Sequence, residues 1–300
     1  MMEYRILGRT GLMVSTLGFG ALEIGRNWPY WRQDKEDFTR PDESEAVKVI
    51  YKALDFGVNF FDTAPAYQAS EYILGKALHG IRKEVLIATK CGEWFDGTQS
   101  RYDYSYTETK KFIDNSLRLL KTDYVDLLQI HSATADIIKK GETLQAMKEA
   151  QQAGKARFIG LSTEYSDAAL LAIESGEYDS IQVSYNAMNI HFAREVFPSA
   201  KEKKIGVIVK DGIARGKLSE KYIDVTTPEE QHKIAKLKSL ADSHHLPLSE
   251  LAIRYVISND AVSTVIIGTK KIEHLAANVA AVRNGNLPKE IVSVIDEMNA

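Results

Sequence analysis

Four polar residues of complementary chemistry, Asp62, Tyr67, Lys90 and His131, stand at or just after the ends of three successive apolar segments. A tyrosine hydroxyl has an ordinary pKa of about 10, and a neighbouring lysine ammonium is expected to lower that pKa by favouring the phenolate. Asp62 can hold Lys90 charged and in place, and His131 can hydrogen-bond a carbonyl oxygen and orient it. Such a set can give a proton to an oxygen that becomes an alkoxide. Because no side chain supplies a hydride, a reduction here would need a nicotinamide cofactor.

Each of the four residue types also has an ordinary structural explanation. An Asp or Lys at a strand end is more often a cap or an ion-pair partner than a catalyst, and a Tyr there usually packs. A His at a strand end is divided about evenly between the two roles. Four such residues directed at one place make structural explanations much weaker, so we interpret the set as catalytic.

The elements that must position these residues are short apolar segments, each followed by an amphipathic helical pattern. Several segments are continuous apolar runs, which are typical of strands buried on both faces of a parallel sheet. The predicted strands are Thr16–Gly20, Asn59–Thr63, Val85–Lys90, Tyr124–His131, Ala156–Ser162, Ser180–Tyr185, Gly206–Lys210 and Ser263–Gly268. Between them, helical spacing begins behind Asp42 and Glu45, behind the N-cap candidate Thr107, and at Pro247. Gly57 can end the first of these helices.

Eight strand-then-helix units predict a closed (β/α)8 barrel, in which catalytic groups lie at the carboxyl ends of the strands. The rival is an open doubly wound sheet, whose usual mark is Gly-x-Gly-x-x-Gly at the first turn. The segment Gly18-Phe19-Gly20 lacks the third glycine. We therefore favour the barrel, as a single domain over residues 1–300.

Three departures from a minimal barrel are predicted. Residues 4–14 form a hairpin that could plug the bottom of the barrel, with the turn between Gly8 and Gly11. Residues 22–41 are a long insertion after the first strand. Two extra helices, near residues 228–243 and 249–258, lie between the seventh and eighth strands.

Length, composition and charge exclude several classes of protein. At roughly 150 residues per domain, 300 residues suggest two domains, but one α/β barrel can take the whole length. The chain is 44% hydrophobic and 26% charged, as in an ordinary globular protein, with a formal net charge of −3. This balance gives no electrostatic reason to bind nucleic acid or an acidic membrane. With Cys91 as the only cysteine, no signal peptide and no membrane-length apolar run, we expect a cytoplasmic protein.

The motifs that carry these residues resemble those of the aldo-keto reductases, and the resemblance runs over almost the whole chain. It is nearest to bacterial-type members, with some similarity to the sugar-dehydrogenase branch. The matching motifs are Leu7-Gly8-Arg9-Thr10-Gly11, Asn59-Phe60-Phe61-Asp62-Thr63-Ala64-Pro65-Ala66-Tyr67, Ser70-Glu71, Ala88-Thr89-Lys90, Asp123-Tyr124-Val125-Asp126-Leu127-Leu128-Gln129-Ile130-His131 and Phe158-Ile159-Gly160-Leu161-Ser162.

The resemblance implies a site for NADP, with NADPH preferred over NADH. It assigns the catalytic tetrad to Asp62, Tyr67, Lys90 and His131, and Tyr67 is the general acid for reduction. Thr163 stands where the family usually has Asn, and Lys210 replaces a stacking aromatic, as in some bacterial-type members. The implied cofactor-binding residues are Gly20, Ala21, Asp62, Ser162, Gln182, Tyr185, Lys210, Gly212, Ile213, Arg215, Gly268, Thr269, Lys270, His274 and Asn278.

The substrate pocket is expected to be built from aromatic residues of the loops, namely Trp28, Trp31, Trp94 and Phe192. Ordinary loop packing explains each of them about as well. Cys91 is either a small buried filler or a reactive thiol at the pocket edge. No metal site is predicted.

Reduction of an aldehyde or ketone with NAD(P)H, with Tyr67 as proton donor, is the function that the resemblance favours. The alternative is an aldose dehydrogenase that works in the oxidative direction. A Schiff-base lyase using Lys90 or Lys210, and a cofactor-binding subunit without activity, are weaker hypotheses. The partners are small molecules, and the sequence leaves substrate, direction and oligomeric state open.

Overall fold

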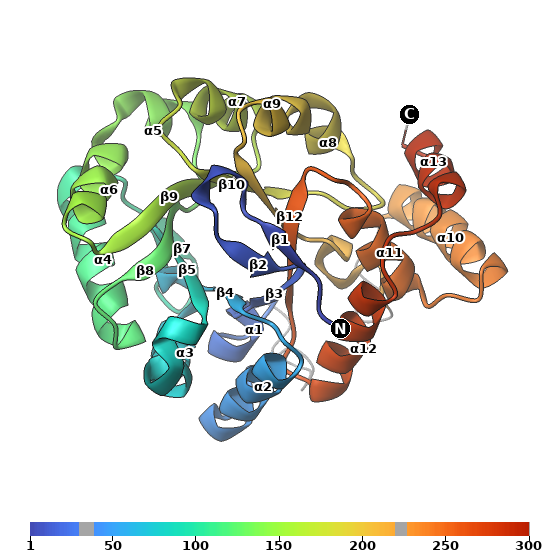
Figure 1. Cartoon of the computed structure of the whole chain (residues 1–300), viewed down its shortest axis with the longest axis horizontal. Helices are drawn as coiled ribbons and strands as arrows, with labels where there is room; N and C mark the ends of the chain where they lie inside the picture. The colour runs from blue at the N-terminus through green and yellow to red at the C-terminus, as the bar shows by residue number, and fades with distance from the viewer. Residues whose placement is uncertain (30–38, 220–226, 300) are drawn as a thin grey trace.

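The computed structural model of the chain describes residues 1–29, 39–219 and 227–299. Parallel strands close into a barrel in the order β3-β4-β5-β8-β9-β10-β11-β12, and β12 pairs back onto β3. Helices surround the barrel as a ring (Figure 1). The predicted (β/α)8 barrel and its eight strands are confirmed. The barrel strands are β3 (Leu17–Gly20), β4 (Phe60–Asp62), β5 (Leu86–Cys91), β8 (Val125–Ile130), β9 (Ala156–Ser162), β10 (Ser180–Ser184), β11 (Gly206–Lys210) and β12 (Val262–Gly268).

The strands are apolar because the barrel interior covers one face and the helices cover the other. Every residue of β8 is buried, as are the first four residues of β11. Parallel pairing sets Lys90 of β5 beside Gln129 of β8, and Asp62 of β4 beside Ala88 of β5. The polar residues at the carboxyl ends of the strands are thereby brought to one mouth of the barrel.

The surrounding helices largely begin and end where their apolar spacing predicts. Ser105 caps α4, because its Oγ accepts a hydrogen bond from the Glu108 backbone N–H, so the predicted N-cap at Thr107 was wrong. Asp42 stands at the N-cap position of α2 but makes no side-chain cap. The helices are α1 (Leu22–Gly25), α2 (Glu43–Asp55), α3 (Ser70–Leu78), α4 (Tyr106–Leu120), α5 (Ala135–Lys140), α6 (Glu142–Gln152), α7 (Ser166–Ser175), α8 (His191–Glu195), α9 (Phe197–Glu202), α10 (Pro228–Ser243), α11 (Leu248–Ile257), α12 (Ile272–Arg283) and α13 (Lys289–Glu297).

The N-terminal hairpin closes the bottom of the barrel, as predicted. Its strands are β1 (Tyr4–Ile6) and β2 (Met13–Ser15), and Figure 1 shows them lying across one end of the barrel. The buried side chains of Leu7, Leu12 and Val14 pack with residues from inside the barrel. Gly8 has a φ of 49°, and a Cβ there would lie 2.2 Å from the backbone nitrogen of Gly206. The hairpin therefore fits against the start of β11 only with glycine at this turn.

The other departures differ in how well the sequence predicted them. The two extra helices between the seventh and eighth barrel strands are confirmed as α10 and α11. The insertion after β3 contains α1, and residues 30–38, including Trp31, lie outside the described residues. An antiparallel hairpin of β6 (Glu93–Phe95) and β7 (Ser100–Tyr102) follows β5 and was not predicted. Across the described part of the chain, no helix is both long and apolar enough to span a bilayer.

Candidate active site

Lys90 lies at the centre of the polar cluster in the barrel mouth. Its Nζ donates a hydrogen bond to Asp62 Oδ2 at 2.6 Å and another to the Thr63 carbonyl at 2.9 Å. The Tyr67 hydroxyl accepts a longer one at 3.4 Å. The side chains of Lys90 and Asp62 are 0% and 1% exposed, so water does not screen their attraction. The structure thus brings together three of the four residues predicted to be catalytic.

Two glutamines hold the second oxygen of Asp62. Nε2 of Gln182 donates to Asp62 Oδ1 at 2.7 Å, and Nε2 of Gln129 lies at 3.3 Å from the same oxygen. Both glutamines are buried. Gln129 was not predicted as a site residue, although it lies two positions before His131, and residues two apart along a strand share a face. The carboxylate is therefore fixed from both sides before any substrate binds.

Tyr67 ends a short 3₁₀ turn, Pro65–Tyr67, which follows β4. Burial raises the pKa of Tyr67 well above its ordinary value, and the charges of Asp62 and Glu93 raise it further. The expectation that Lys90 leaves this pKa lowered was therefore wrong. Asp62 offsets the charge of Lys90, and burial disfavours the phenolate. The Tyr67 hydroxyl keeps its proton at neutral pH.

Arg26 is a buried cation that the sequence did not single out. Its guanidinium carbon lies 4.2 Å from the ring centroid of Phe95 and 5.4 Å from that of Trp28. Nη1 donates to the carbonyl of Ala66, beside Tyr67, at 2.9 Å. The charge of Arg26 lowers the pKa of Tyr67, although less than burial raises it. An isolated Arg in an insertion has no spacing signal that could mark it as part of a site.

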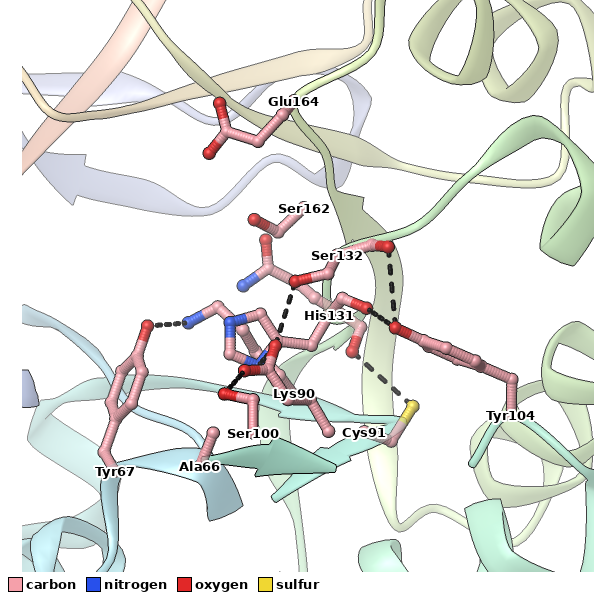
Figure 2. Close-up of polar contacts among 12 residues, drawn as sticks. Ala66, Tyr67, Lys90, Cys91, Ser100, Tyr104, His131, Ser132, Ser162 and Glu164 are labelled. Carbon is pink, nitrogen blue, oxygen red and sulfur yellow. Dashed lines mark hydrogen bonds and ion pairs between the residues drawn. The ribbon is translucent and has the colours of Figure 1, made fainter. Parts of the chain in front are cut away.

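His131 completes the predicted cluster. Its ring meets the Tyr67 ring edge-on, with centroids 5.8 Å apart and an angle of 83° between the planes. Figure 2 shows the ring directed toward Lys90 and Tyr67. Burial lowers the pKa of His131 well below its ordinary value, and the charges of Lys90, Lys210 and Arg26 lower it further. His131 is therefore neutral at neutral pH. One of its ring nitrogens is a hydrogen-bond donor and the other an acceptor, and one of them can hydrogen-bond a substrate oxygen.

Glu93 is a third residue of the cluster that the sequence did not reveal. It begins β6, and its Oε2 lies 3.2 Å from Nδ1 of His131. Ser132 Oγ donates to Oε2 at 2.9 Å, and Ser100 Oγ donates to Oε1 at 2.7 Å. The hairpin of β6 and β7 thus places a hydrogen-bonded carboxylate next to Nδ1 of His131.

A second group of charges lines the mouth at the ends of β9 and β11. Nζ of Lys210 lies 2.9 Å from Glu164 Oε1 and donates to Ser162 Oγ at 3.1 Å. Arg215 Nε donates to Asp211 Oδ2 at 3.2 Å, and its Nη2 lies 3.4 Å from Glu164 Oε1. Three of the predicted cofactor-binding residues, Ser162, Lys210 and Arg215, therefore lie in one ionic network.

The loop after β11 has an unusual backbone. Asp211, Ala214 and Arg215 have φ angles of 59°, 50° and 57°, in the left-handed region that favours glycine. A Cβ at Gly212 would lie 2.6 Å from Cγ2 of Val265, so this position is closely packed. Such backbone strain is concentrated at functional sites, where surrounding structure holds it in place.

The residues expected to hold the adenosine end lie around the start of α12. Thr269 is buried, and the Lys270 ammonium contacts the carbonyl of Thr39 in the insertion. On α12 itself, His274 is exposed and Asn278 is buried. Next to them, the ends of β3 and β12 approach closely. A Cβ at Gly20 would lie 3.2 Å from the backbone nitrogen of Gly268. Ala21 donates its backbone N–H to the Asp62 carbonyl at 2.9 Å.

Several predicted site residues lie away from this cluster. The Tyr185 ring packs between helices, with centroids 5.3 Å from Phe197 and 5.5 Å from Tyr255. Phe192 is buried in the core. Trp94 is 37% exposed and lines a cleft of about 450 Å³ against α3 and α4. The cofactor role of Tyr185 and the substrate-pocket roles of these aromatic residues stay predictions.

Cys91 follows Lys90, but its side chain is directed away from Tyr67 and the polar cluster (Figure 2). It is fully buried, and its Sγ donates to the Gln129 carbonyl at 3.5 Å. Burial raises the pKa of the thiol to about 12, so the reactive thiolate is not formed at neutral pH. Of the two expectations, the structure supports a buried filler.

Comparison with known proteins agrees with this arrangement. A model described as the aldo/keto reductase family matches residues 16–300. An L-galactose dehydrogenase of Arabidopsis thaliana is 33% identical, over 93% of this chain and 88% of its own length. A pyridoxal 4-dehydrogenase of Microbacterium luteolum is 25% identical, over 92% of each chain. The holo form of an aldo-keto reductase from Bacillus halodurans has a TM-score of 0.86 at 31% identity, covering 99% of this chain and 96% of that one. The chain belongs to the aldo/keto reductase family, whose members are oxidoreductases that use nicotinamide cofactors.

Proposed function

We propose that this protein is an NADP-dependent oxidoreductase that reduces aldehydes or ketones to alcohols, with Tyr67 as the proton donor. The observation that supports this most directly is the Tyr67 hydroxyl at 3.4 Å from the Lys90 ammonium, which Asp62 holds at 2.6 Å. A bound nicotinamide would supply the hydride, and the chain supplies the proton and the orientation of the substrate.

The proton step follows from the burial of Tyr67. Because its pKa is raised, Tyr67 holds a proton at neutral pH and can give it to a substrate oxygen on which negative charge develops. The Lys90 ammonium then lies beside the phenolate that remains and stabilises it. His131, which is neutral, lies beside Tyr67 and can hydrogen-bond the alcohol that is the product.

The residues at the ends of β9, β11 and β12 fit a dinucleotide. Ser162 and Lys210 offer hydrogen-bond donors beside the catalytic cluster, and Arg215 with the strained loop after β11 offers charge and backbone amides for a pyrophosphate. Gly20 and Gly268, which let the ends of β3 and β12 approach each other closely, are proposed as contacts of the same cofactor. Lys270, near the start of α12, supports a preference for NADPH over NADH, because a cation there would neutralise a ribose 2′-phosphate.

An oxidative role is the second candidate. Two relatives of this chain, from Arabidopsis thaliana and Microbacterium luteolum, are named L-galactose dehydrogenase and pyridoxal 4-dehydrogenase. In that direction the Tyr67 phenol would accept a proton from an alcohol after losing its own, and Lys90 and Arg26 are the cations that favour the loss. Aldoses are then the substrate class to test first.

The two other hypotheses are weaker. A lyase that forms a Schiff base needs a free amine, but a buried carboxylate holds Lys90 as an ammonium, and Glu164 pairs with Lys210. An inactive cofactor-binding subunit has no need for a catalytic cluster with its geometry intact. We also propose that the chain works as one domain. A reducing compartment such as the cytoplasm suits it, because a chain with one cysteine has no intrachain disulfide.

Fluorescence titration with NADPH and NADH, followed by a panel of aldehydes, ketones and aldoses, tests this function. Tyr67→Phe is expected to lower kcat/KM by about 10²–10⁴-fold, the usual contribution of a general acid, with the Kd for NADPH unchanged. Tyr102→Phe is the matched control, because Tyr102 is 54% exposed. Turnover by Tyr67→Phe at the wild-type rate would overturn the proposal.

A further inference from the structure

Glu93 reaches the active site from outside the barrel. Glu93 is 7% exposed, and Ser100 and Ser132 donate hydrogen bonds to its two carboxylate oxygens at 2.7 and 2.9 Å. Ser132 has a φ of 53°, which is unfavourable for a serine and is held by its surroundings. The carboxylate beside His131 is thus preorganised by two donors and by a strained backbone.

The position of this carboxylate bears on which nitrogen of His131 carries the proton. Oε2 of Glu93 lies 3.2 Å from Nδ1, which is buried and has no hydrogen bond of good geometry to any described residue. The contact is therefore electrostatic. An anion at this distance favours a proton on Nδ1 and disfavours a lone pair there. Nε2, on the other side of the imidazole ring, then carries the lone pair.

We propose that Glu93 is a positioning residue, which fixes the Nδ1–H tautomer of His131 and presents Nε2 to the barrel mouth as a hydrogen-bond acceptor. The catalytic consequence rests on the proposed function. An unprotonated Nε2 accepts a hydrogen bond from the hydroxyl of an alcohol, whereas a carbonyl oxygen offers no hydrogen to it. While Tyr67 keeps its proton, the single hydroxyl hydrogen of a bound alcohol can therefore be donated to Nε2 of His131, and it turns to Tyr67 only when Tyr67 is a phenolate. The carbonyl form depends on Tyr67.

The other charges that act on His131 are positive. Lys90 on β5, Lys210 on β11 and Arg26 after α1 are cations that lower the pKa of His131 and keep it neutral. Glu93 is the anion that the described structure places against the ring, and its charge also raises the pKa of Tyr67. Loss of this one charge should therefore be detectable at both catalytic groups.

Glu93→Gln removes the charge and keeps the shape, and an amide can face Nδ1 with its donor or its acceptor. Long-range ¹H–¹⁵N spectra distinguish the two tautomers, and His131→Gln assigns the signals. We expect wild-type His131 to carry its proton on Nδ1, and the Nε2–H tautomer to gain population in Glu93→Gln. Asp96→Asn is the matched control. Asp96 accepts hydrogen bonds from the Thr98 and Gln99 backbones in the turn of the same hairpin and does not touch His131.

Kinetics give the second readout. In Glu93→Gln we expect KM for an alcohol to rise by about twofold to tenfold, the loss of one neutral hydrogen bond, with a smaller change for the corresponding aldehyde. The loss of reductase activity at alkaline pH should begin at lower pH, because the pKa of Tyr67 falls when the carboxylate is removed. Asp96→Asn should leave both unchanged.

The outcomes separate the two proposals. If the wild-type protein turns over no carbonyl, alcohol or sugar, the proposed function fails, while the spectra still decide the role of Glu93. An unchanged tautomer in Glu93→Gln, or equal effects of Glu93→Gln and Asp96→Asn, would overturn the inference.

Discussion

Lys90 and Asp62 form an ion pair in the barrel mouth in which both side chains are buried. A buried ion pair often adds little stability compared with an apolar pair of similar volume, since both charges lose their hydration. Removal of one partner has a far larger effect, because the other charge is left in the interior without compensation. The pair is therefore better explained by its position beside Tyr67 than by stability.

This reasoning predicts a non-additive effect on stability. Lys90→Met should lower the free energy of unfolding by about 3–5 kcal/mol, because the Asp62 carboxylate loses its partner. Lys90→Met combined with Asp62→Asn should recover most of that loss. Urea denaturation of the two single variants and the double variant measures the coupling. Additive losses would contradict this account of the pair.

Glu71, at the start of α3, is a buried acid outside the polar cluster of the barrel mouth. Thr89 Oγ1 donates to its Oε1 at 2.6 Å, and Oε2 is buried without a well-formed hydrogen bond to any described residue. Burial raises the pKa of Glu71 from 4.5 to about 7. A raised pKa in the folded state means that the protonated acid is favoured there. The native state is therefore stabilised below about pH 4.5, and this stabilisation is lost as the pH rises through about 7.

Glu71→Gln should remove this part of the pH dependence. Above the pKa of about 7, the variant is expected to be more stable than the wild type by an amount on the order of 3 kcal/mol. At acidic pH the two proteins should converge. Denaturation curves at several pH values test the sign, and Glu45→Gln on the exposed face of α2 is the control. If the free energy of unfolding of Glu71→Gln changed with pH as steeply as that of the wild type, another group would be responsible for the pH dependence.

At the scale of elements, the N-terminal hairpin offers two glycines that separate backbone strain from packing. Gly8 and Gly11 both have left-handed φ angles, of 49° and 69°. A Cβ at Gly8 meets the backbone of β11 at 2.2 Å, whereas a Cβ at Gly11 meets no atom within 4 Å. A side chain at Gly8 would therefore clash with β11, whereas a side chain at Gly11 would not clash with any described residue.

Gly11→Ala is therefore expected to cost about 1–2 kcal/mol, the penalty for a left-handed alanine. Gly8→Ala should cost at least twice as much, because the hairpin must also move away from the barrel. The denaturant midpoints of the two variants, compared at constant m-value, measure the difference. Equal losses of stability in the two variants would mean that the hairpin moves away from β11 at no cost in free energy.

The barrel strands could be predicted from sequence because a strand covered on both faces has to be apolar throughout. The hairpin of β6 and β7 was missed because each strand has three residues and carries polar side chains. The Asp96-Gly97 turn was a signal that could have revealed it. The cap of α4 was placed two residues late, although Ser105 with Glu108 has the spacing of a capping box.

The positions of three site residues could be predicted from the strands, whereas other parts of the site could not. Asp62, Lys90 and His131 come together because strand ends meet at one mouth. The direction of the Tyr67 pKa shift was predicted wrongly, because burial and the pairing of Lys90 depend on the three-dimensional arrangement. Glu93 lies in the β6–β7 hairpin and Arg26 in the insertion after β3, two connections of irregular length in which sequence spacing does not indicate which side chains face the mouth.

At the scale of the whole molecule, the barrel and its plug link distant parts of the chain. Arg5 of the hairpin donates to the carbonyl of Val262 at 3.0 Å, and β12 pairs with β3. If the chain is one domain, as we propose, it should lose its structure in a single step. Near-ultraviolet and far-ultraviolet circular dichroism in urea are expected to give coincident curves. Two separated transitions would contradict a single domain.

The pairing of β3 with β12 also sets a condition on how the protein is made. On the ribosome, β3 emerges before the other barrel strands, whereas β12, the strand that completes its edge, emerges last of them, from Val262 onward. Through most of translation the nascent barrel therefore has an open edge, and open strand edges pair readily with other chains. Polypeptides released before Val262 would keep that edge permanently, so premature termination should yield aggregates rather than a smaller soluble protein.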